Sequence, residues 1–588
     1  MRRGVAFVLG FITVAVIVSF VAMVAMFFVV SRGPSVPDRA TLVVRPGGEL
    51  VEQAPDDVFG QVLARDTVTV RALVNSLRRA ARDERITSVL LLPTTLQSPF
   101  WAKVQDVRDA VLEFRRSGKQ VIAFLEYGGD REYYLASAAD RVFLLPTSPL
   151  DLTGVASYEV FLRGALDKIG AVPDFVRVGD YKTAVNTFTE SGFTPAHREM
   201  TESLNRDMYD QLVRAIAESR RMTEAEVRTL IDQGPFTPRA ALQAGLVDDL
   251  AYFDQLDDRV PELRGDDDDP RRLEGADYAR GGGFGGGRNR VAVLLASGVI
   301  ASGRSAFDTV NGNIVGSDTM VEQIRRVRDD ESVRAVVLRV DSPGGSSVAS
   351  DVIWRELAIT RDQNPSRPLV ASMSDLAASG GYYIAMAAPT IVAQPATLTG
   401  SIGIFGGKIA LGGTAGKLGV TTGTVAAGRS AAMMSPFDTF TPDQRAKLQN
   451  YMNGFYDHFV ATVAESRGKT PAEIHAVAQG RVWTGRQARE HGLVDALGGL
   501  DAAITLAKER AGIPADEDVD VVFYPPRRTL FEALREQFGS AGVRAMHASP
   551  LRALVGDVDA RALAALTAPA RLFRRGEPLA LMPFAFVR

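Results

Sequence analysis

Two short stretches of this 588-residue chain place a serine and paired glycines where acyl-transfer chemistry would need them. Ser379 is followed by Gly380-Gly381 after an apolar run, and Gly344-Gly345 close a second apolar run. A serine before glycines at the start of a helix combines a hydroxyl, backbone N–H donors and a helix dipole, which are the parts of an oxyanion hole. The alternative is that both are ordinary strand-to-helix turns in which small residues pack tightly.

A serine hydroxyl is a poor nucleophile unless a base activates it. The five histidines lie in polar, helix-like or tail segments, none of them beside a glycine-rich turn: His197, His458, His475, His491 and His547. The G-x-S-x-G pattern of a nucleophile elbow is also absent around Ser379, so a Ser-His-Asp triad is not expected.

Lys182 is the candidate base, because it lies among small and apolar residues after Gly179-Asp180-Tyr181. Burial lowers the pKa of a lysine from its usual value of about 10.4, and a shift of a few units leaves the amine neutral. The alternative is a surface lysine paired with Asp180.

The elements that position these residues belong to an α/β unit that occurs twice in the chain, at a spacing near 249 residues. Residues 132–136 (EYYLA) correspond to residues 381–385 (GYYIA), and residues 245–248 (GLVD) recur at 492–495. Each copy alternates β-branched runs with amphipathic stretches, which is typical of βα units.

The two copies do not carry the same chemistry. Ser379 falls on Asp130 of the first copy, and Lys182 falls on Ala431 of the second. Each copy thus holds one half of a Ser/Lys pair, and we expect the pair to form across a domain or subunit contact.

The chain divides into segments of different composition. We expect a cytoplasmic tip at 1–3, a transmembrane anchor at 4–30, the first repeat at 39–262, an Asp/Gly-rich linker at 263–289, the second repeat at 290–512 and a C-terminal extension at 513–588. Whether this extension packs on the second repeat or lies against a membrane is left open.

The anchor is predicted from residues 4–30, which contain no charge. As a helix this segment would be roughly 40 Å long, enough to cross a bilayer core of about 30 Å. A cleaved signal peptide is the rival interpretation, but its apolar region would be about half as long. Arg2 and Arg3 favour a cytoplasmic N-terminus and place the repeats outside the cytoplasmic membrane.

Composition excludes several classes of site. The formal net charge of −3 gives no footprint for nucleic acid, and the absence of cysteine excludes disulfides, thiolate metal sites and a cysteine nucleophile. The acidic run at 266–269 lacks the spaced ligands of a calcium loop. We expect no metal and no cofactor.

At the stretches 179–185, 341–345, 377–384 and 396–406 the sequence resembles signal peptide peptidase A of the long, protease IV type. The resemblance covers roughly residues 40–512 in correct order and includes the duplication and the anchor. Thr183 and the pair Asn186-Thr187 depart from the usual pattern, which affects only the expected cleavage preference.

The resemblance implies a residue-by-residue assignment. Ser379 would be the nucleophile, Lys182 the general base and Ser401 the serine that positions the lysine amine. Backbone N–H groups of Gly380, Gly344 and Gly345 would form the oxyanion hole.

The resemblance also implies a fold and a setting. It implies tandem ClpP/crotonase-like spiral α/β domains, a homotetramer, and remnant signal peptides as substrates, cut in or beside the bilayer. Two other functions are weighed. A crotonase-like acyl-CoA enzyme would need an acidic residue near the glycine turns, and a non-catalytic membrane scaffold would not retain both Ser379 and Lys182.

Overall fold

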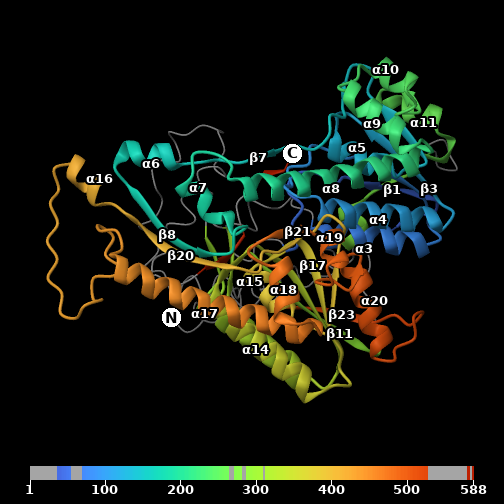
Figure 1. The fold of residues 1–588 in the computed structure, drawn as a ribbon. Helices are drawn as coiled ribbons and strands as arrows, with labels where there is room; N and C mark the ends of the chain where they lie inside the picture. The colour runs from blue at the N-terminus through green and yellow to red at the C-terminus, as the bar shows by residue number, and fades with distance from the viewer. Residues whose placement is uncertain are drawn as a thin grey trace, which may run out of the picture.

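The computed structural model describes residues 36–53, 69–263, 271–280, 287–308, 312–526, 579–582 and 586–587. Both repeats fold as largely parallel sheets covered by helices, and a third sheet joins them (Figure 1). The predicted anchor, residues 4–30, lies outside the described residues. Within the described part of the chain, no helix is long and apolar enough to cross a bilayer.

The first repeat is built on a six-stranded parallel sheet in the order β10-β1-β2-β3-β5-β9. Its strands are apolar on both faces because helices and loops cover both sides. The elements are β1 (Ala40–Val44), α3 (Val70–Arg82), β2 (Ile86–Leu91), α4 (Ala102–Arg116), β3 (Gln120–Leu125), β4 (Gly128–Gly129), α5 (Asp130–Ala136), β5 (Arg141–Leu144), β6 (Leu150–Asp151), β7 (Ser157–Tyr158), α6 (Arg163–Ile169), β8 (Val172–Val178), α7 (Asn186–Thr189), α8 (Pro195–Arg220), α9 (Glu224–Gln233), α10 (Pro238–Gln243), β9 (Asp249–Leu250) and α11 (Leu256–Arg259).

The second repeat is built on the parallel strands β23, β11, β15 and β17, and the last of these divides its edge between two partners. The first half of β17 pairs with β18 and its end pairs with β19. The elements are β11 (Arg290–Ser297), β12 (Val299–Ala301), β13 (Ala306–Asp308), β14 (Gly312–Gly316), α13 (Ser317–Asp329), β15 (Val333–Ser342), β16 (Gly344–Ser346), α14 (Ser347–Gln363), β17 (Leu369–Ala378), α15 (Gly380–Ala385), β18 (Thr390–Ala393), β19 (Leu398–Gly400), β20 (Ile404–Ala410), α16 (Gly412–Lys417), α17 (Pro442–Arg467), α18 (Pro471–Val477), β21 (Val482–Thr484), α19 (Gly485–Glu490), β22 (Ala496–Leu497), α20 (Leu500–Arg510) and β23 (Asp520–Tyr524).

Equivalent elements of the two repeats end and pack alike. Helices α8 and α17 both have 26 residues, and each begins after a threonine cap, Thr194 or Thr441, with proline as its first residue. The hydroxyl of Tyr133 donates to the carbonyl of Leu246, and that of Tyr382 donates in the same way to Leu493. The duplication predicted from the sequence is therefore present in the fold.

A third sheet contains strands from both repeats and from the C-terminal extension, in the order β13-β14-β12-β16-β24-β20-β8. Strand β8 of the first repeat runs antiparallel to β20 of the second along the full length of both, and the two lie side by side in Figure 1. Strand β24 (Leu579–Leu581) lies between β16 and β20. This sheet brings the end of β8 to the second repeat.

Two segments outside the predicted repeats contribute strands to the sheets. Within the expected linker, β10 (Arg272–Glu274) pairs with β1, and α12 (Gly275–Arg280) follows it. Leu273 and Tyr278 are buried there and hold the segment on the first repeat, so this part is not the solvated linker expected. In the extension, β23 completes the second sheet and β24 joins the third.

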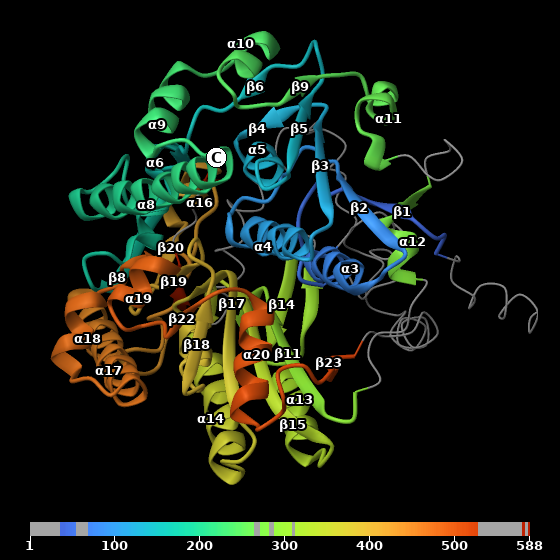
Figure 2. The same cartoon turned by 90° about the vertical axis from the view of Figure 1, so that its right-hand side faces the viewer.

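The two repeats meet through helices α3 and α4. Figure 2 shows the first-repeat sheet above the second-repeat sheet, with these two helices at the boundary. Helix α4 contacts β17, the strand that leads to Ser379. The second repeat is therefore supported by the first directly behind the candidate nucleophile.

Candidate active site

Lys182 reaches the second repeat through a turn that only glycines permit. Gly179, just after β8, has a φ of 98°, and a Cβ there would lie 2.3 Å from the backbone of Gln479. A Cβ at Gly480 would lie 2.5 Å from the Cα of Lys182. Tyr181 N–H donates to the Gln479 carbonyl at 3.0 Å. The two backbones thus touch, and the side chain of Lys182 is fully buried.

Ser379 lies between the end of β17 and the start of α15, in a backbone conformation that serine rarely adopts. Its φ is 56° and its ψ is −111°. Such a conformation is strained and persists only where neighbouring contacts hold it. One of these is the hydrogen bond from Ser379 N–H to the Gly400 carbonyl, at 2.8 Å.

Ser401 follows β19, the strand that pairs with the end of β17. It also has a positive φ, of 50°, and its N–H donates to the Arg481 carbonyl at 2.7 Å. The parallel pairing of Ala378 with Gly400 places Ser379 and Ser401 at equivalent positions just beyond two neighbouring strands. Both serines therefore lie at the same edge of the sheet.

The three predicted side chains meet within one chain. Lys182 Nζ lies 2.8 Å from Ser379 Oγ, and it lies 3.0 Å from both the Oγ and the carbonyl oxygen of Ser401. All three residues are fully buried. The pair expected across a domain or subunit contact forms across the contact between the two repeats, and the alternative of a surface Lys182 paired with Asp180 is wrong.

Burial decides the protonation of Lys182. Desolvation is the cause that lowers the pKa of its amine well below the ordinary 10.5. A neutral amine has two N–H groups, which fit the two oxygens of Ser401, and one lone pair, which fits the hydroxyl proton of Ser379. This arrangement allows Lys182 to accept the proton of Ser379.

The two glycine turns lie against each other beside Ser379. A Cβ at Gly380 would lie 3.2 Å from both Gly345 N and Gly344 Cα. Gly344 and Gly345 have φ values of 102° and 153°. The two backbones are so close that no side chain larger than hydrogen fits between them, and the N–H of Gly344 donates to Ser342 Oγ at 3.2 Å.

The described residues of the first repeat contain no equivalent of the Ser379 nucleophile. The carboxylate of Asp130, which falls where the second repeat has Ser379, accepts hydrogen bonds from the N–H groups of Thr153 and Gly154, each at 2.9 Å. These bonds stabilise a turn. The amides that follow β6 are thereby bonded to a side chain of their own repeat.

One histidine is misplaced by the sequence reasoning. His197 was expected on a polar, solvated helix face, yet it is buried in α8, and its Nε2 lies 2.7 Å from a carboxylate oxygen of Glu159. Its Nδ1 lies 3.4 Å from the amide nitrogen of Asn186. The partners of His197 come from elements distant in sequence, which local polarity does not reveal.

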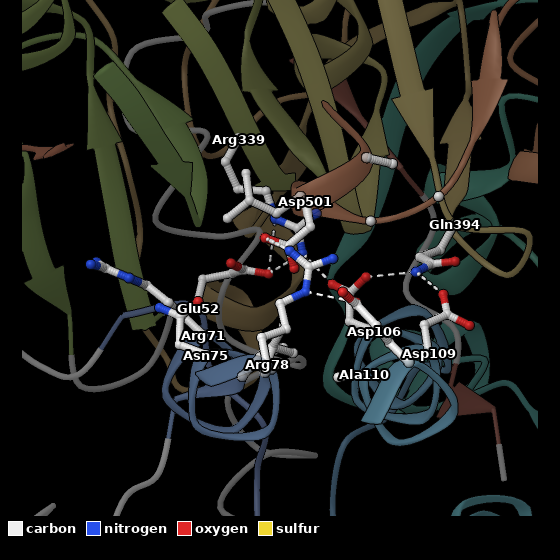
Figure 3. Close-up of a pocket in the computed structure, with 17 residues that line it drawn as sticks. Glu52, Arg71, Asn75, Arg78, Asp106, Asp109, Ala110, Arg339, Gln394 and Asp501 are labelled. Carbon is white, nitrogen blue, oxygen red and sulfur yellow. Dashed lines mark hydrogen bonds and ion pairs between the residues drawn. The ribbon is translucent and has the colours of Figure 1, made fainter. Parts of the chain in front are cut away.

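Sequence reasoning also missed a buried charge cluster between the repeats, which we call the inter-repeat cluster. Arg339 of β15 forms ion pairs with Glu52 and Asp106 of the first repeat, at 2.6 and 2.7 Å (Figure 3). Lys103 of α4 pairs with Asp341 and Asp375 at 2.7 and 3.2 Å. A signal was present, because Arg339 and Asp341 follow the apolar run Ala335–Leu338 within one buried strand.

The inter-repeat cluster lies behind the site. Asp341 is two residues before Pro343 and the Gly344-Gly345 turn, and it accepts from Leu376 N–H at 3.3 Å. Each cation of the cluster pairs with two carboxylates, Arg339 with Glu52 and Asp106, and Lys103 with Asp341 and Asp375. Among the described residues, no group of three or more His, Asp or Glu side chains is arranged to hold a metal ion.

Comparison with known proteins matches both repeats to one family. The profile of Peptidase family S49 matches residues 113–265 and again 361–514. The first match contains Lys182, and the second contains Ser379 and Ser401.

Whole-chain relatives agree with the family profile. The chain is 32% identical to the chloroplastic serine protease SPPA of Arabidopsis thaliana over 489 residues, which cover 82% of this chain and 71% of that protein. It is 34% identical to Protease 4 of Salmonella typhi over 499 residues, with 82% and 78% covered. Protease 4 of Haemophilus influenzae is 29% identical over 463 residues, with 74% and 72% covered.

Proposed function

The chain belongs to Peptidase family S49 and is a serine peptidase, and from this premise we propose that Ser379 is its nucleophile and Lys182 its general base. The observation that carries the assignment is the 2.8 Å contact of Lys182 Nζ with Ser379 Oγ inside a fully buried site. Ser401 holds the amine from two sides in this proposal. It is therefore a positioning residue.

The reaction we propose is acyl transfer. Neutral Lys182 takes the proton of Ser379 as Oγ attacks the carbonyl carbon of the scissile bond. N–H groups of Gly380 and of the Gly344-Gly345 turn stabilise the oxyanion. The protonated lysine then gives its proton to the leaving amine. A water molecule, deprotonated by the same amine, hydrolyses the acyl-enzyme and releases Ser379.

For substrates we propose peptides presented at a membrane, remnant signal peptides among them. This rests on the uncharged segment 4–30, which would anchor the chain in the cytoplasmic membrane with its repeats on the outer side. We also propose that each repeat is a ClpP/crotonase-type domain and that the chains assemble as a homotetramer. Light scattering on detergent-solubilised protein measures the assembly, and protease protection of sealed vesicles measures the orientation.

A serine-directed acylating probe, applied across a range of pH, tests the dyad. We expect modification at Ser379, mapped by mass spectrometry, with a rate that rises with pH as Lys182 loses its proton. Ser379→Ala should abolish labelling, and Lys182→Met should slow it by about 10²–10⁴-fold.

The matched controls are Ser137→Ala and Lys408→Met. Ser137 is a buried serine of the first repeat, and Lys408 is a buried lysine that donates to the Met433 carbonyl. Neither contacts the dyad, so both variants should label like the parent. Unchanged labelling of Lys182→Met at every pH would refute its role as the base.

A further inference from the structure

The third sheet contains a strand from the C-terminal extension, beyond the end of the second family match. The profile ends at residue 514, whereas β24 consists of Leu579–Leu581. This strand lies between β16 and β20 and is antiparallel to both. All four residues from Leu579 to Met582 are buried.

The neighbours of β24 are the elements that carry the active site. Strand β16 contains the Gly344-Gly345 turn, β20 follows Ser401, and β8, beyond β20, leads to Lys182. Because β24 separates β16 from β20, each of these two strands turns an edge toward it. A gap one strand wide between two edges is the arrangement by which proteins bind extended peptides through main-chain hydrogen bonds.

The pairing register places one peptide bond of β24 beside the glycines of the two turns. Gly345 pairs with Ala580 and Gly344 with Leu581. A Cβ at Gly344 would lie 2.0 Å from the carbonyl oxygen of Ala580 and 2.8 Å from Gly380 N. The Ala580 carbonyl therefore lies next to the N–H groups that we assign to the oxyanion hole.

The side chains of β24 alternate as those of a bound peptide would. Leu579 and Leu581 pack on one side in an apolar cluster with Phe175, Phe188 and Phe405. Between them Ala580, the small residue, lies opposite Gly345, and Met582 packs with the core of the first repeat. Prolines at 578 and 583 flank these four residues in the sequence, and proline cannot donate to a strand ladder.

We propose that residues 579–582 occupy the peptide-binding cleft of this chain's own active site, as an intramolecular competitor of substrate. The proposal rests on the proposed function, since the cleft is defined by the assigned dyad and oxyanion donors. It also specifies the peptide that the cleft accepts: an extended segment with a small residue at the reacting bond and leucine-sized apolar residues on either side.

A reversible cross-link tests the occupancy in the full chain. The chain has no cysteine, so Leu579→Cys combined with Phe405→Cys introduces the only pair. These residues are direct cross-strand partners, and opposed antiparallel residues lie within disulfide reach.

The oxidised variant should label at Ser379 at least ~10-fold more slowly than the same protein after reduction. It should also hydrolyse a fluorogenic peptide correspondingly more slowly. The single-cysteine variants should not respond to oxidation. Two results would overturn the proposal: a cross-linked chain that labels as fast as the reduced one, or no cross-link in the folded protein.

A truncation gives a second readout. A chain ending at Pro578 should have a KM lowered by about 10-fold or more with kcat unchanged, because an intramolecular ligand acts at roughly millimolar effective concentration. A chain ending at Met582 keeps the segment and is the matched control. Equal KM values for the two truncations and the parent would count against the proposal.

Binding can be measured without catalysis. A fluorescent peptide of residues 576–582 should bind the Pro578 truncation carrying Ser379→Ala, and the same peptide with aspartate at 579 and 581 should not. If no form of the protein labels or cleaves but the peptide binds, the proposed function fails and the cleft assignment stands. If labelling is normal and the peptide does not bind, the cleft assignment fails alone.

Discussion

Replacing Lys182 by methionine separates what a buried lysine does for catalysis from what it does to stability. Methionine has a similar length, keeps the cavity filled and cannot accept a proton. Loss of a general base lowers rates by about 10²–10⁴-fold, so kcat/KM of Lys182→Met should fall by at least ~10²-fold. This loss of rate would follow from removing the amine that contacts Ser379 Oγ.

The stability effect follows from the lowered pKa of Lys182. In the folded chain burial holds this pKa well below 10.5, whereas the unfolded chain has the ordinary value. Between the two values the unfolded state carries a proton that the folded state lacks, so folding becomes less favourable as pH falls. Each pH unit in this window costs about 1.4 kcal/mol. Lys182→Met has no such dependence.

The hydrogen bonds lost in Lys182→Met lower the stability of the variant and so act against its advantage at low pH. The variant leaves Ser379 and Ser401 without the amine, at about 1–3 kcal/mol for each buried group left unsatisfied. That loss does not depend on pH. The difference in the free energy of unfolding between the two proteins therefore has no predicted sign at any single pH, whereas its change with pH does.

Urea unfolding of parent and variant at several pH values below 10.5 measures the slope. The free energy of unfolding of Lys182→Met, relative to the parent, should rise by about 1.4 kcal/mol for each unit of decreasing pH. It should level off once the native lysine takes up its proton. Lys447→Met, at an exposed lysine that pairs with Asp443, provides the control for loss of a lysine elsewhere. A difference that stays constant over the whole window would show that Lys182 is charged in the folded protein, which would refute its role as a base.

Three further substitutions address the groups around the dyad. Ser401→Ala removes an oxygen 3.0 Å from the amine and leaves the carbonyl contact, so steady-state kinetics should show kcat lowered by about tenfold at unchanged KM. Gly344→Ala places a Cβ 2.0 Å from the Ala580 carbonyl oxygen at a φ of 102°, and the kcat for a fluorogenic peptide should fall by about 10²-fold or more. Arg339→Met leaves Glu52 and Asp106 buried without their cation, and urea titration should show a loss of about 3–5 kcal/mol in the free energy of unfolding. Adding Glu52→Gln should restore part of it.

The parts of the fold and site that could be predicted are those that depend on short, local sequence motifs. The duplication could be predicted because short stretches such as residues 245–248 and 492–495 recur in the same order, and the structure places the threonine-proline starts of α8 and α17 equivalently. Ser379 is marked by the glycines that its strained turn requires, and Lys182 is marked by its small and apolar neighbours. Each of these features depends on a few neighbouring residues, so it can be predicted from the sequence alone.

The parts that were not predictable arise from packing between distant segments. Glu52 and Arg339 are separated by 287 residues and meet only when the repeats dock. Leu579–Leu581 are three apolar residues in a long extension, too few to show a period, and their strand exists only because β16 and β20 provide two edges. His197 looks polar in sequence and is buried because Glu159 and Asn186 reach it.

Because the two repeats each supply one member of the dyad, their docking controls two properties that catalysis needs. It sets the distance between Lys182 and Ser379, and it sets the pKa of Lys182 by burying the amine. Lys182 is enclosed mainly by the second repeat: a Cβ at Gly480 would lie 2.5 Å from its Cα, and one at Gly403 would lie 3.2 Å from its Cδ. Water entering this contact would restore the ordinary pKa of the amine and protonate it at neutral pH. An interface weakened by Arg339→Met should therefore lose activity first by protonation of Lys182, and alkaline pH should restore kcat/KM toward the parent value. A folded Arg339→Met chain that stays equally inactive between pH 7 and pH 10 would instead indicate that the two side chains have moved apart.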